Sequence, residues 1–361
     1  REFEIDGRDF KLNGKRLHLR SAASQLPIRG AENQTAGQYR KNAEIMKSFG
    51  LNHLIPLNYN FSPGETGYQD AFYVENSRNG ILTTLTLPHP ASFDWKLDDP
   101  AVQAKYRMLT GYLIRRYQNV PGLILYASTH NATGYSGDQN PARIDGVYTP
   151  DPFLKKNAKQ SYLHRRQALL AADLVKQLDP TRPVYHHESG NLGPMYTINC
   201  YLNWAPLQER SDWLEHWETH GVKPLYMMEW GMPHVCSWSS FRGPAFIWSA
   251  NAVQCIWLNE YNAQFLGEEA YRAAGQKISM MKAQEKLNTG NREVHFSRFN
   301  WFSRFTDVQK VWSILIGANF RDLRARGLSG LLPWDGDAYW NADRAPKSRP
   351  LPDRFSNLKR T

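Results

Sequence analysis

Short apolar runs and helical stretches alternate along most of this chain. A typical unit starts with an apolar run, continues through a polar loop rich in Gly, Pro, Asn or His, and ends in a segment with helical periodicity. Such alternation is typical of βα units that build a parallel sheet. Eight runs have the character of buried strands: residues 17–22, 51–57, 81–87, 122–128, 183–189, 195–201, 224–230 and 329–335. Eight such strands favour a closed (β/α)8 barrel, also called a TIM barrel, over an open sheet.

The segments between these strands carry helical patterns. They include residues 35–50, 99–119, 155–179 and 308–327. In the third segment, apolar residues recur at the spacing of a helix that packs one face on a barrel: Leu163, Ala168, Leu170, Leu174 and Leu178. We therefore interpret residues 1–361 as a single α/β barrel domain, with its functional residues at the carboxyl ends of the strands.

Two regions fall outside the minimal barrel. Residues 1–16 have the pattern of a small hairpin around Asn13-Gly14, a dipeptide that favours a type I′ turn, and we expect this hairpin to close the barrel floor. Residues 232–329 form a long insertion between the seventh and eighth strands and have a helical pattern of their own. A connection of this length is either a packed helical insertion or a lid that forms part of a substrate cleft.

The composition is that of an ordinary globular chain. Hydrophobic residues make up 41% and charged residues 22% of the sequence, which excludes wholesale disorder. No apolar run is long enough to predict a transmembrane helix, so no membrane partner is expected. The chain starts at "REFEID" without a charged and apolar leader. We therefore expect a secreted or periplasmic protein whose signal peptide has been removed.

Charge and cysteine usage narrow the partners and cofactors. The formal net charge of +10 attracts polyanions, but the basic residues are scattered and no nucleic-acid-binding motif accompanies them. The charge therefore indicates either an ordinary solvated basic surface or a surface for an acidic partner, and of the two candidate partners an anionic glycan is a better expectation than nucleic acid. The three cysteines, Cys200, Cys236 and Cys255, lack CxxC spacing, and "HHES" at 186–189 lacks the i, i+4 histidine spacing of a helical zinc site. No metal and no cofactor is expected.

Polar and aromatic residues gather at the predicted strand ends, where a barrel carries its chemistry. They are His89, His130, Asn131, His186, His187, Glu188, Asn199, Tyr201, Glu229, Trp230, Trp334, Asp335 and Asp337. Glu229 follows the apolar run "PLYMM", which would hold it rigidly at the barrel mouth, and Gly231 then lets the chain turn away. A buried carboxylate at this position is either paired with an arginine or carries chemistry.

Several longer motifs occur in a characteristic order. They are "FEIDGRDFKLNGKRLHLRS" at the start, "AEIMKSFGLNHLIPLNYN" in the second βα unit, "DPTRPVYHHESGN" and "TINCYLNW" at strands five and six, "KPLYMMEWGMP" at strand seven and "SGLLPWDGD" at strand eight. In order and spacing they resemble the catalytic barrel of glycoside hydrolase family 2, the β-galactosidase and β-glucuronidase family of clan A. The resemblance covers nearly the whole chain except the long insertion.

The resemblance implies an enzyme that hydrolyses a β-linked polysaccharide or oligosaccharide, with galactose-containing chains as the first expectation. It implies that Glu229 is the nucleophile, that Tyr201 orients it, that Asn199 supports its strand end, and that Trp334 is an aromatic platform beneath a sugar ring. Retaining hydrolysis needs one ionised carboxylate to attack the anomeric carbon and one protonated carboxyl, roughly 5–5.5 Å away, to protonate the leaving oxygen.

Strand four departs from the family pattern. The pattern Trp-Ser-x-Gly-Asn-Glu aligns with residues 126–131, so the amide of Asn131 replaces the expected acid. Another carboxyl could protonate the leaving group, and the candidates are Asp138, Glu188, Asp335 and Asp337. Asp138 is favoured among them, because its loop leaves strand four where the acid is missing.

Two other interpretations of strand four stay open. His130 could be the general acid, because imidazole exchanges protons near neutral pH. Alternatively, the chain has lost catalysis and is a barrel that only binds glycans. In either case His130 and Asn131 can hydrogen-bond sugar hydroxyls, and His89, Trp230 and Asp335 are further candidates for substrate binding.

Overall fold

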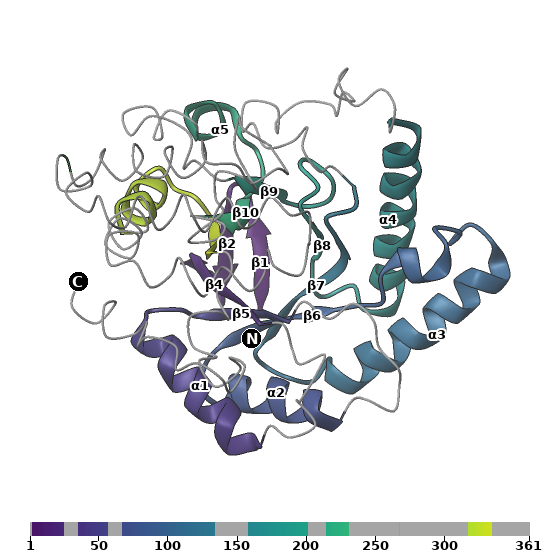
Figure 1. Ribbon diagram of the computed structural model, residues 1–361, viewed down its shortest axis with the longest axis horizontal. Helices are drawn as coiled ribbons and strands as arrows, with labels where there is room; N and C mark the ends of the chain where they lie inside the picture. Colours follow the sequence, from purple (N-terminus) through teal and green to yellow (C-terminus); the bar gives the residue numbers. More distant parts are fainter. Residues whose placement is uncertain are drawn as a thin grey trace, which may run out of the picture. The chain divides into compact units, whose positions relative to one another are not determined.

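The parallel sheet has the eight strands that the apolar runs predict. The computed structural model describes residues 2–24, 35–56, 67–133, 158–200, 214–230, 267 and 317–333. The strands follow the order β8-β7-β6-β5-β4-β11-β10-β9 around the sheet (Figure 1). Their bounds are Leu19–Ser24 (β4), His53–Pro56 (β5), Leu82–Thr86 (β6), Leu123–His130 (β7), Val184–His187 (β8), Tyr196–Cys200 (β9), Leu225–Trp230 (β10) and Gly330–Pro333 (β11). Sheet order and strand direction are those of a (β/α)8 barrel, so the predicted fold is confirmed.

The strands read as continuous apolar runs because both of their faces are covered. Every residue of β5, β6, β8 and β10 whose side chain is described is buried. The two edge strands, β8 and β9, are joined just beyond β8 by a pair of backbone hydrogen bonds between Gly190 and Thr197, at 2.8 and 3.0 Å. This bridge places the loop after β8 next to β9, the strand at the other edge of the sheet.

Helices line the outside of the strands (Figure 1). The α-helices are Ala36–Ser48 (α1), Gly67–Arg78 (α2), Pro100–Tyr117 (α3), Ala158–Leu178 (α4) and Glu215–His220 (α5), and a 3-10 helix, η3, spans Pro90–Phe93. Two helices begin where the sequence places capping residues: the Thr35 side chain accepts from the Gln38 N–H, and Asp99 accepts from Ala101 and Val102. The remaining described helical residues, 317–325, lie within the predicted segment 308–327.

The predicted inner face of α4 is partly wrong. Ala168 and Leu174 are buried as expected, but Leu163 is 42% exposed. The buried stripe instead continues through Ala171 and Val175. Leu163 lies in the first turns of the helix, whereas Ala171 lies in its middle.

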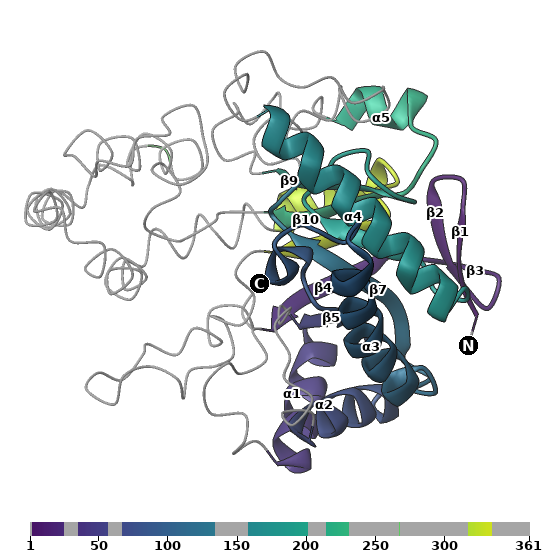
Figure 2. The ribbon, with the colours of Figure 1, turned by 90° about the vertical axis from the view of Figure 1, so that its right-hand side faces the viewer.

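The N-terminal segment forms a small sheet of three strands rather than one hairpin. β1 (Phe3–Asp6), β2 (Asp9–Leu12) and β3 (Lys15–Leu17) pair antiparallel. Asn13 and Gly14 both have positive φ, at 51° and 72°, which the expected type I′ turn requires. Leu17 therefore belongs to β3 and not to the first barrel strand. Figure 2 shows the three strands together at one end of the barrel, where Phe3 and Phe10 join the barrel core.

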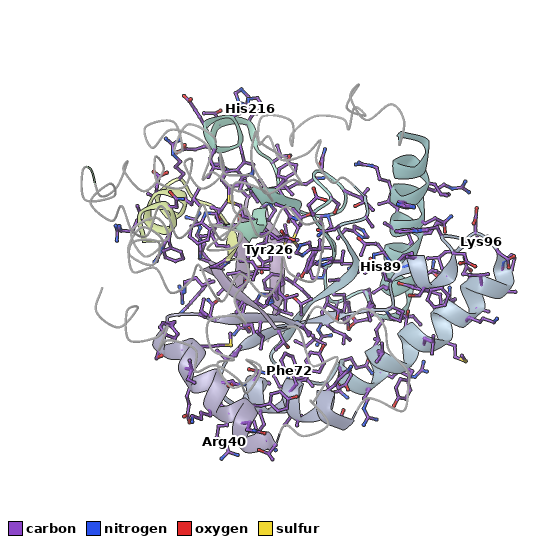
Figure 3. All side chains as sticks on the ribbon, viewed as in Figure 1. Arg40, Phe72, His89, Lys96, His216 and Tyr226 are labelled. Atoms are coloured by element: carbon purple, nitrogen blue, oxygen red, sulfur yellow. The ribbon has the colours of Figure 1, made fainter. Side chains whose placement is uncertain are left out.

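A polar layer crosses the interior of the barrel. The imidazole of His53 on β5 hydrogen-bonds the Ser21 hydroxyl through Nδ1 at 2.9 Å and the Thr84 hydroxyl through Nε2 at 3.0 Å. The Tyr226 hydroxyl on β10 lies 3.1 Å from His53 Nδ1 and also bonds Ser21. Tyr226 lies among the strands in Figure 3. All four side chains are fully buried, so β4, β5, β6 and β10 are tied together by hydrogen bonds as well as by packing.

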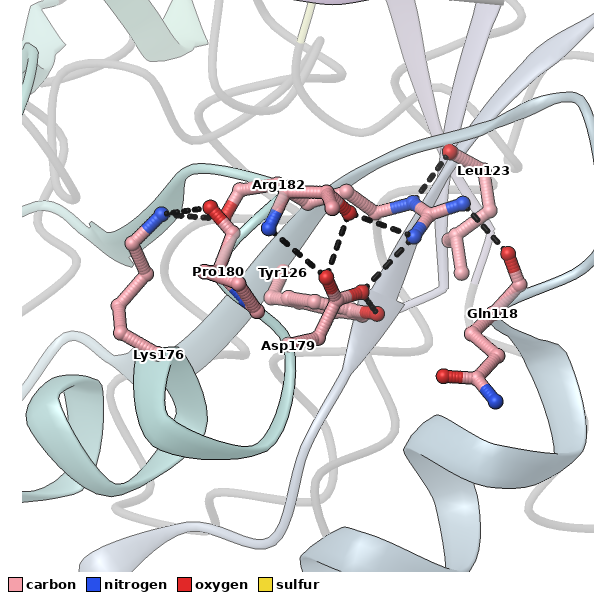
Figure 4. A network of polar contacts seen from close by, with 8 residues as sticks. Gln118, Leu123, Tyr126, Lys176, Asp179, Pro180 and Arg182 are labelled. Atoms are coloured by element: carbon pink, nitrogen blue, oxygen red, sulfur yellow. Dashed lines mark hydrogen bonds and ion pairs between the residues drawn. The ribbon is translucent and has the colours of Figure 1, made fainter.

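A second polar network ties α4 to β7 and β8 (Figure 4). The Asp179 carboxylate accepts from the Tyr126 hydroxyl at 2.5 Å and from Arg182 Nη1 at 2.8 Å. Arg182 also donates to the backbone carbonyls of Leu123 at 2.8 Å and Gln118 at 2.6 Å. Burial raises the pKa of Asp179, but hydrogen bonds from Thr181 and Tyr126 and the charge of Arg182 outweigh burial and lower it. This network fixes the amino-terminal end of β8.

The chain divides into two compact units. One comprises residues 1–200, 213–228 and 326–337, and the other comprises 201–212, 229–325 and 338–361. The division falls inside β10, which itself continues without a break to Trp230. The predicted insertion, residues 232–329, lies almost entirely outside the described residues. Among the described helices, none is both long and apolar enough to cross a membrane.

Candidate active site

Two neighbouring strands end in histidines and are followed by residues with unusual backbone conformations. β7 ends at His130 and β8 at His187, and these two residues are paired in register. Asn131 and Glu188 come next and have positive φ values of 48° and 54°. Side chains other than glycine rarely adopt this conformation, and it concentrates at functional sites. Glu188 is fully buried.

The seventh strand of the barrel brings a carboxylate to the same edge of the sheet. Glu229 and Trp230 are the last two residues of β10, and each is only 1% exposed. A carboxylate buried this deeply needs partners to remain ionised. Two histidines lie close to it: one ring nitrogen each of His130 and His187 and a carboxylate oxygen of Glu229 all lie within 4.8 Å of one another.

The two histidines of this cluster are also in contact with each other. Their rings are stacked, with centroids 4.2 Å apart and planes inclined by 26°. The stacked pair thus places one ring nitrogen of each histidine beside the Glu229 carboxylate.

Hydrogen bonds fix the ends of these strands. The Asn199 amide on β9 donates to the Asn131 side-chain oxygen at 3.2 Å, and the Asn131 N–H donates to the His187 carbonyl at 3.2 Å. His89, at the start of η3, accepts from the Ala91 N–H through Nδ1 at 3.0 Å and hydrogen-bonds the backbone of His130. The strand-end residues are thus held by bonds from the start of η3, from β8 and from β9.

Burial keeps the neighbouring imidazoles neutral. It lowers the pKa of His89 to about 4. The hydrogen bond to the His130 backbone raises this pKa by a smaller amount, and the charge of His164 lowers it further. Burial likewise lowers the pKa of His186 to about 3, and the charges of His89 and Arg165 add to that effect. The Ser128 and Thr129 hydroxyls each lie 3.1 Å from His186 Nδ1. These groups are positioned for hydrogen bonding and not for carrying charge.

The predicted site residues divide into two groups. The structure describes His89, His130, Asn131, Glu188, Asn199, Glu229 and Trp230 at or just beyond the carboxyl ends of barrel strands. The other predicted residues lie outside the described ranges: Asp138, Tyr201, Trp334, Asp335 and Asp337.

Sequence reasoning overlooked one member of the cluster. The sequence places His187 at a strand end but gives it no role, because "HHES" lacks the spacing of a helical metal site. Ligands from three different strands leave no local spacing pattern. The available signal was the pair of histidines at the end of a buried strand, where apolar residues would be the ordinary choice.

Comparison with protein families gives a match over residues 75–297, to the description "Glycosyl hydrolases family 2, TIM barrel domain". No curated protein matches the chain.

Solved structures share the fold at low sequence identity. The β-glucuronidase of Bifidobacterium dentium, complexed with coumarin-3-O-glucuronide, is 13% identical with a TM-score of 0.54, over 100% of this chain and 49% of that one. The Lactobacillus rhamnosus β-glucuronidase is 14% identical with a TM-score of 0.53, over 100% of this chain and 52% of that one. The Parabacteroides merdae β-glucuronidase is 20% identical with a TM-score of 0.43, over 63% of this chain and 26% of that one. The chain thus spans about half the length, or less, of these proteins.

Proposed function

Because the chain belongs to glycosyl hydrolase family 2 through its TIM barrel domain, we propose that it hydrolyses a β-linked glycan with Glu229 as the nucleophile. One observation carries the proposal: a carboxylate, 1% exposed, is the next-to-last residue of a fully buried strand, at the carboxyl edge of the barrel. Burying a carboxylate costs free energy. An apolar residue would therefore be the ordinary choice at this position, unless the carboxylate has a function.

The surroundings of Glu229 suit an attacking carboxylate. A retaining glycosidase forms a covalent bond between a carboxylate oxygen and the anomeric carbon, so the carboxylate must be ionised and held still. The strand restricts its backbone, and one ring nitrogen each of His130 and His187 lies within 4.8 Å of the carboxylate oxygen. Asn199 supports the neighbouring strand end through Asn131.

The leaving group needs a proton donor, and the Asn131 amide is not one. Among the described residues, Glu188 is the candidate carboxyl that we propose: it directly follows β8, it is fully buried, and it has a positive φ of 54°. Asp138, on the loop after β7, is the alternative carboxyl. His130 is the alternative that is not a carboxyl, since its ring nitrogen lies within 4.8 Å of the Glu229 oxygen, a separation close to that of the two catalytic groups in retaining enzymes.

An anionic sugar is the proposed substrate class. The net charge of +10 favours a negatively charged glycan, and the structural neighbours that share the fold over the whole chain carry the name β-glucuronidase. A galactose-containing neutral glycan is the alternative. Trp230 and His89 at the described strand ends, and Tyr201, Trp334 and Asp335 beyond them, are proposed to contact the sugar.

The test is release of reducing sugar from neutral, sulfated and uronic β-glycans by wild type and the Glu229→Gln variant. The expected result is turnover of a uronic or sulfated glycan by wild type and a loss of at least about 10³-fold in the variant, because an amide cannot form the glycosyl–enzyme bond. Glu215→Gln is the matched control, because Glu215 is an exposed carboxylate on α5. Turnover that survives Glu229→Gln would refute the assignment of the nucleophile.

A second comparison identifies the proton donor. Aryl glycosides with an acidic phenol need little protonation of the leaving oxygen, whereas alkyl glycosides need it fully. Glu188→Gln, Asp138→Asn and His130→Gln are compared on both substrates. The variant that loses activity on the alkyl glycoside but keeps it on the aryl glycoside identifies the acid. Equal losses on both substrates would remove that residue from the role.

A second candidate function is a barrel that binds glycans without cleaving them. It is favoured because Asn131 stands where the family pattern has an acid. It predicts saturable binding of a glycan by calorimetry with no product from any substrate of the panel, aryl glycosides included. Turnover of any of them by wild type, abolished in Glu229→Gln, eliminates this second function.

A further inference from the structure

The cluster at the carboxyl ends of β7, β8 and β10 has the composition of a transition-metal site. We propose that His130, His187 and Glu229 bind one divalent transition-metal ion, with Zn²⁺ as the probe. Each of the three side chains offers one ligand atom, and these atoms all lie within 4.8 Å of one another. Two imidazole nitrogens and one carboxylate oxygen form a set that Zn²⁺ uses at sites with an open coordination position.

The ligand types select the class of ion. Mg²⁺ and Ca²⁺ take oxygen ligands almost exclusively, whereas imidazole suits Zn²⁺ and the other late divalent metals of the first transition row. Zn²⁺ requires distances of about 2.0–2.2 Å to nitrogen and oxygen.

The two histidines lie side by side at the strand ends. Their rings are stacked with centroids 4.2 Å apart. The site is also preorganised: His130 and His187 are paired in register between β7 and β8, and the His130 backbone is hydrogen-bonded by His89. Support of this kind around the ligands raises metal affinity.

A second pair of histidines has to be removed before binding is measured. His216 and His220 lie one turn apart on α5, with ring centroids 4.6 Å apart, and two histidines at i and i+4 on one face of a helix can bind a metal themselves. The experiment therefore uses the full chain carrying His216→Ala and His220→Ala as its reference.

Isothermal titration calorimetry of Zn²⁺ into this reference chain, after treatment with a chelator, tests the proposal. One ion per chain is expected to bind, and Glu229→Gln and His187→Gln are each expected to weaken binding by more than about tenfold. The matched control is His164→Gln: this ring stacks on Trp95 with centroids 3.8 Å apart and contacts the Ala132 carbonyl, but it is not a member of the cluster. The control is expected to bind Zn²⁺ like the reference chain.

Circular dichroism shows whether each variant is folded. If His187→Gln unfolds, His130→Gln takes its place, because His130 is only half-buried. The absence of Zn²⁺ binding to the reference chain would overturn the proposal. So would binding that neither cluster variant weakens.

One consequence rests on the proposed function and is measured separately. If Glu229 is the nucleophile, an ion on its carboxylate occupies the place of the anomeric carbon, so Zn²⁺ is expected to inhibit hydrolysis competitively and a chelator to restore it. Binding in the calorimeter does not depend on turnover. A chain that binds Zn²⁺ through the cluster but cleaves no glycan would therefore refute the proposed function and leave the metal site standing.

Discussion

The buried imidazole of His53 predicts a stability that declines in acid. Burial lowers the pKa of His53 from its ordinary value of 6.5 to about 3 in the folded chain. A histidine held neutral in the folded state stabilises it fully above the pKa of the unfolded chain. That contribution is lost as the pH falls from 6.5 towards 3, because the unfolded chain takes up the proton first.

The magnitude follows from the size of the shift. Each pH unit below the unfolded pKa removes about 1.4 kcal/mol for one such group. Between about pH 7 and about pH 4.5 the folded state therefore loses about 2.5 kcal/mol through His53 alone. The groups that face the ring cannot compensate: Ser21 and Thr84 are uncharged, and burial raises the pKa of Tyr226 well above its ordinary value, so that its hydroxyl also stays neutral.

Urea unfolding at these two pH values measures the loss. His53→Gln removes the titrating group, so the variant should lose about 2.5 kcal/mol less than wild type between the two pH values, whatever its stability at neutral pH. The comparison also cancels the contributions of His89 and His186, which both proteins keep. His220→Gln, at the exposed end of α5, is the control and should behave like wild type. Equal losses in wild type and His53→Gln would refute the reasoning.

Two further predictions concern the barrel scaffold. Arg182→Gln leaves the buried Asp179 carboxylate without its cation and frees two backbone carbonyls, so it should destabilise the fold by about 3 kcal/mol in thermal or urea unfolding; a loss below about 0.5 kcal/mol would contradict a structural role for the pair. Gly330→Ala places a Cβ 2.7 Å from the Tyr226 ring, which is held by hydrogen bonds and cannot move aside, so it should cost about 1–3 kcal/mol. An alanine variant as stable as wild type would show that β10 and β11 can separate.

The site shows where prediction from the sequence ended. The sequence singles out Glu229 because a charged residue inside an apolar run is conspicuous by itself, and its role stays a prediction. His187 was not assigned a role, because its meaning depends on the register that sets it beside His130 and on the approach of Glu229 on a third strand. The positive φ values of Asn131 and Glu188 were likewise invisible in the sequence.

The sequence by itself determined the number, order and approximate bounds of the barrel strands, because burial of both strand faces imposes continuous apolar runs that local composition reveals. It also determined the starts of α1 and α3, because Thr35 and Asp99 cap their helices through bonds to residues at most three positions away. Only the tertiary structure decided which strand ends lie together, that Leu17 belongs to the small sheet, and that Ala171 rather than Leu163 faces inward. These features depend on pairing and packing between distant segments, whose energies no local pattern records.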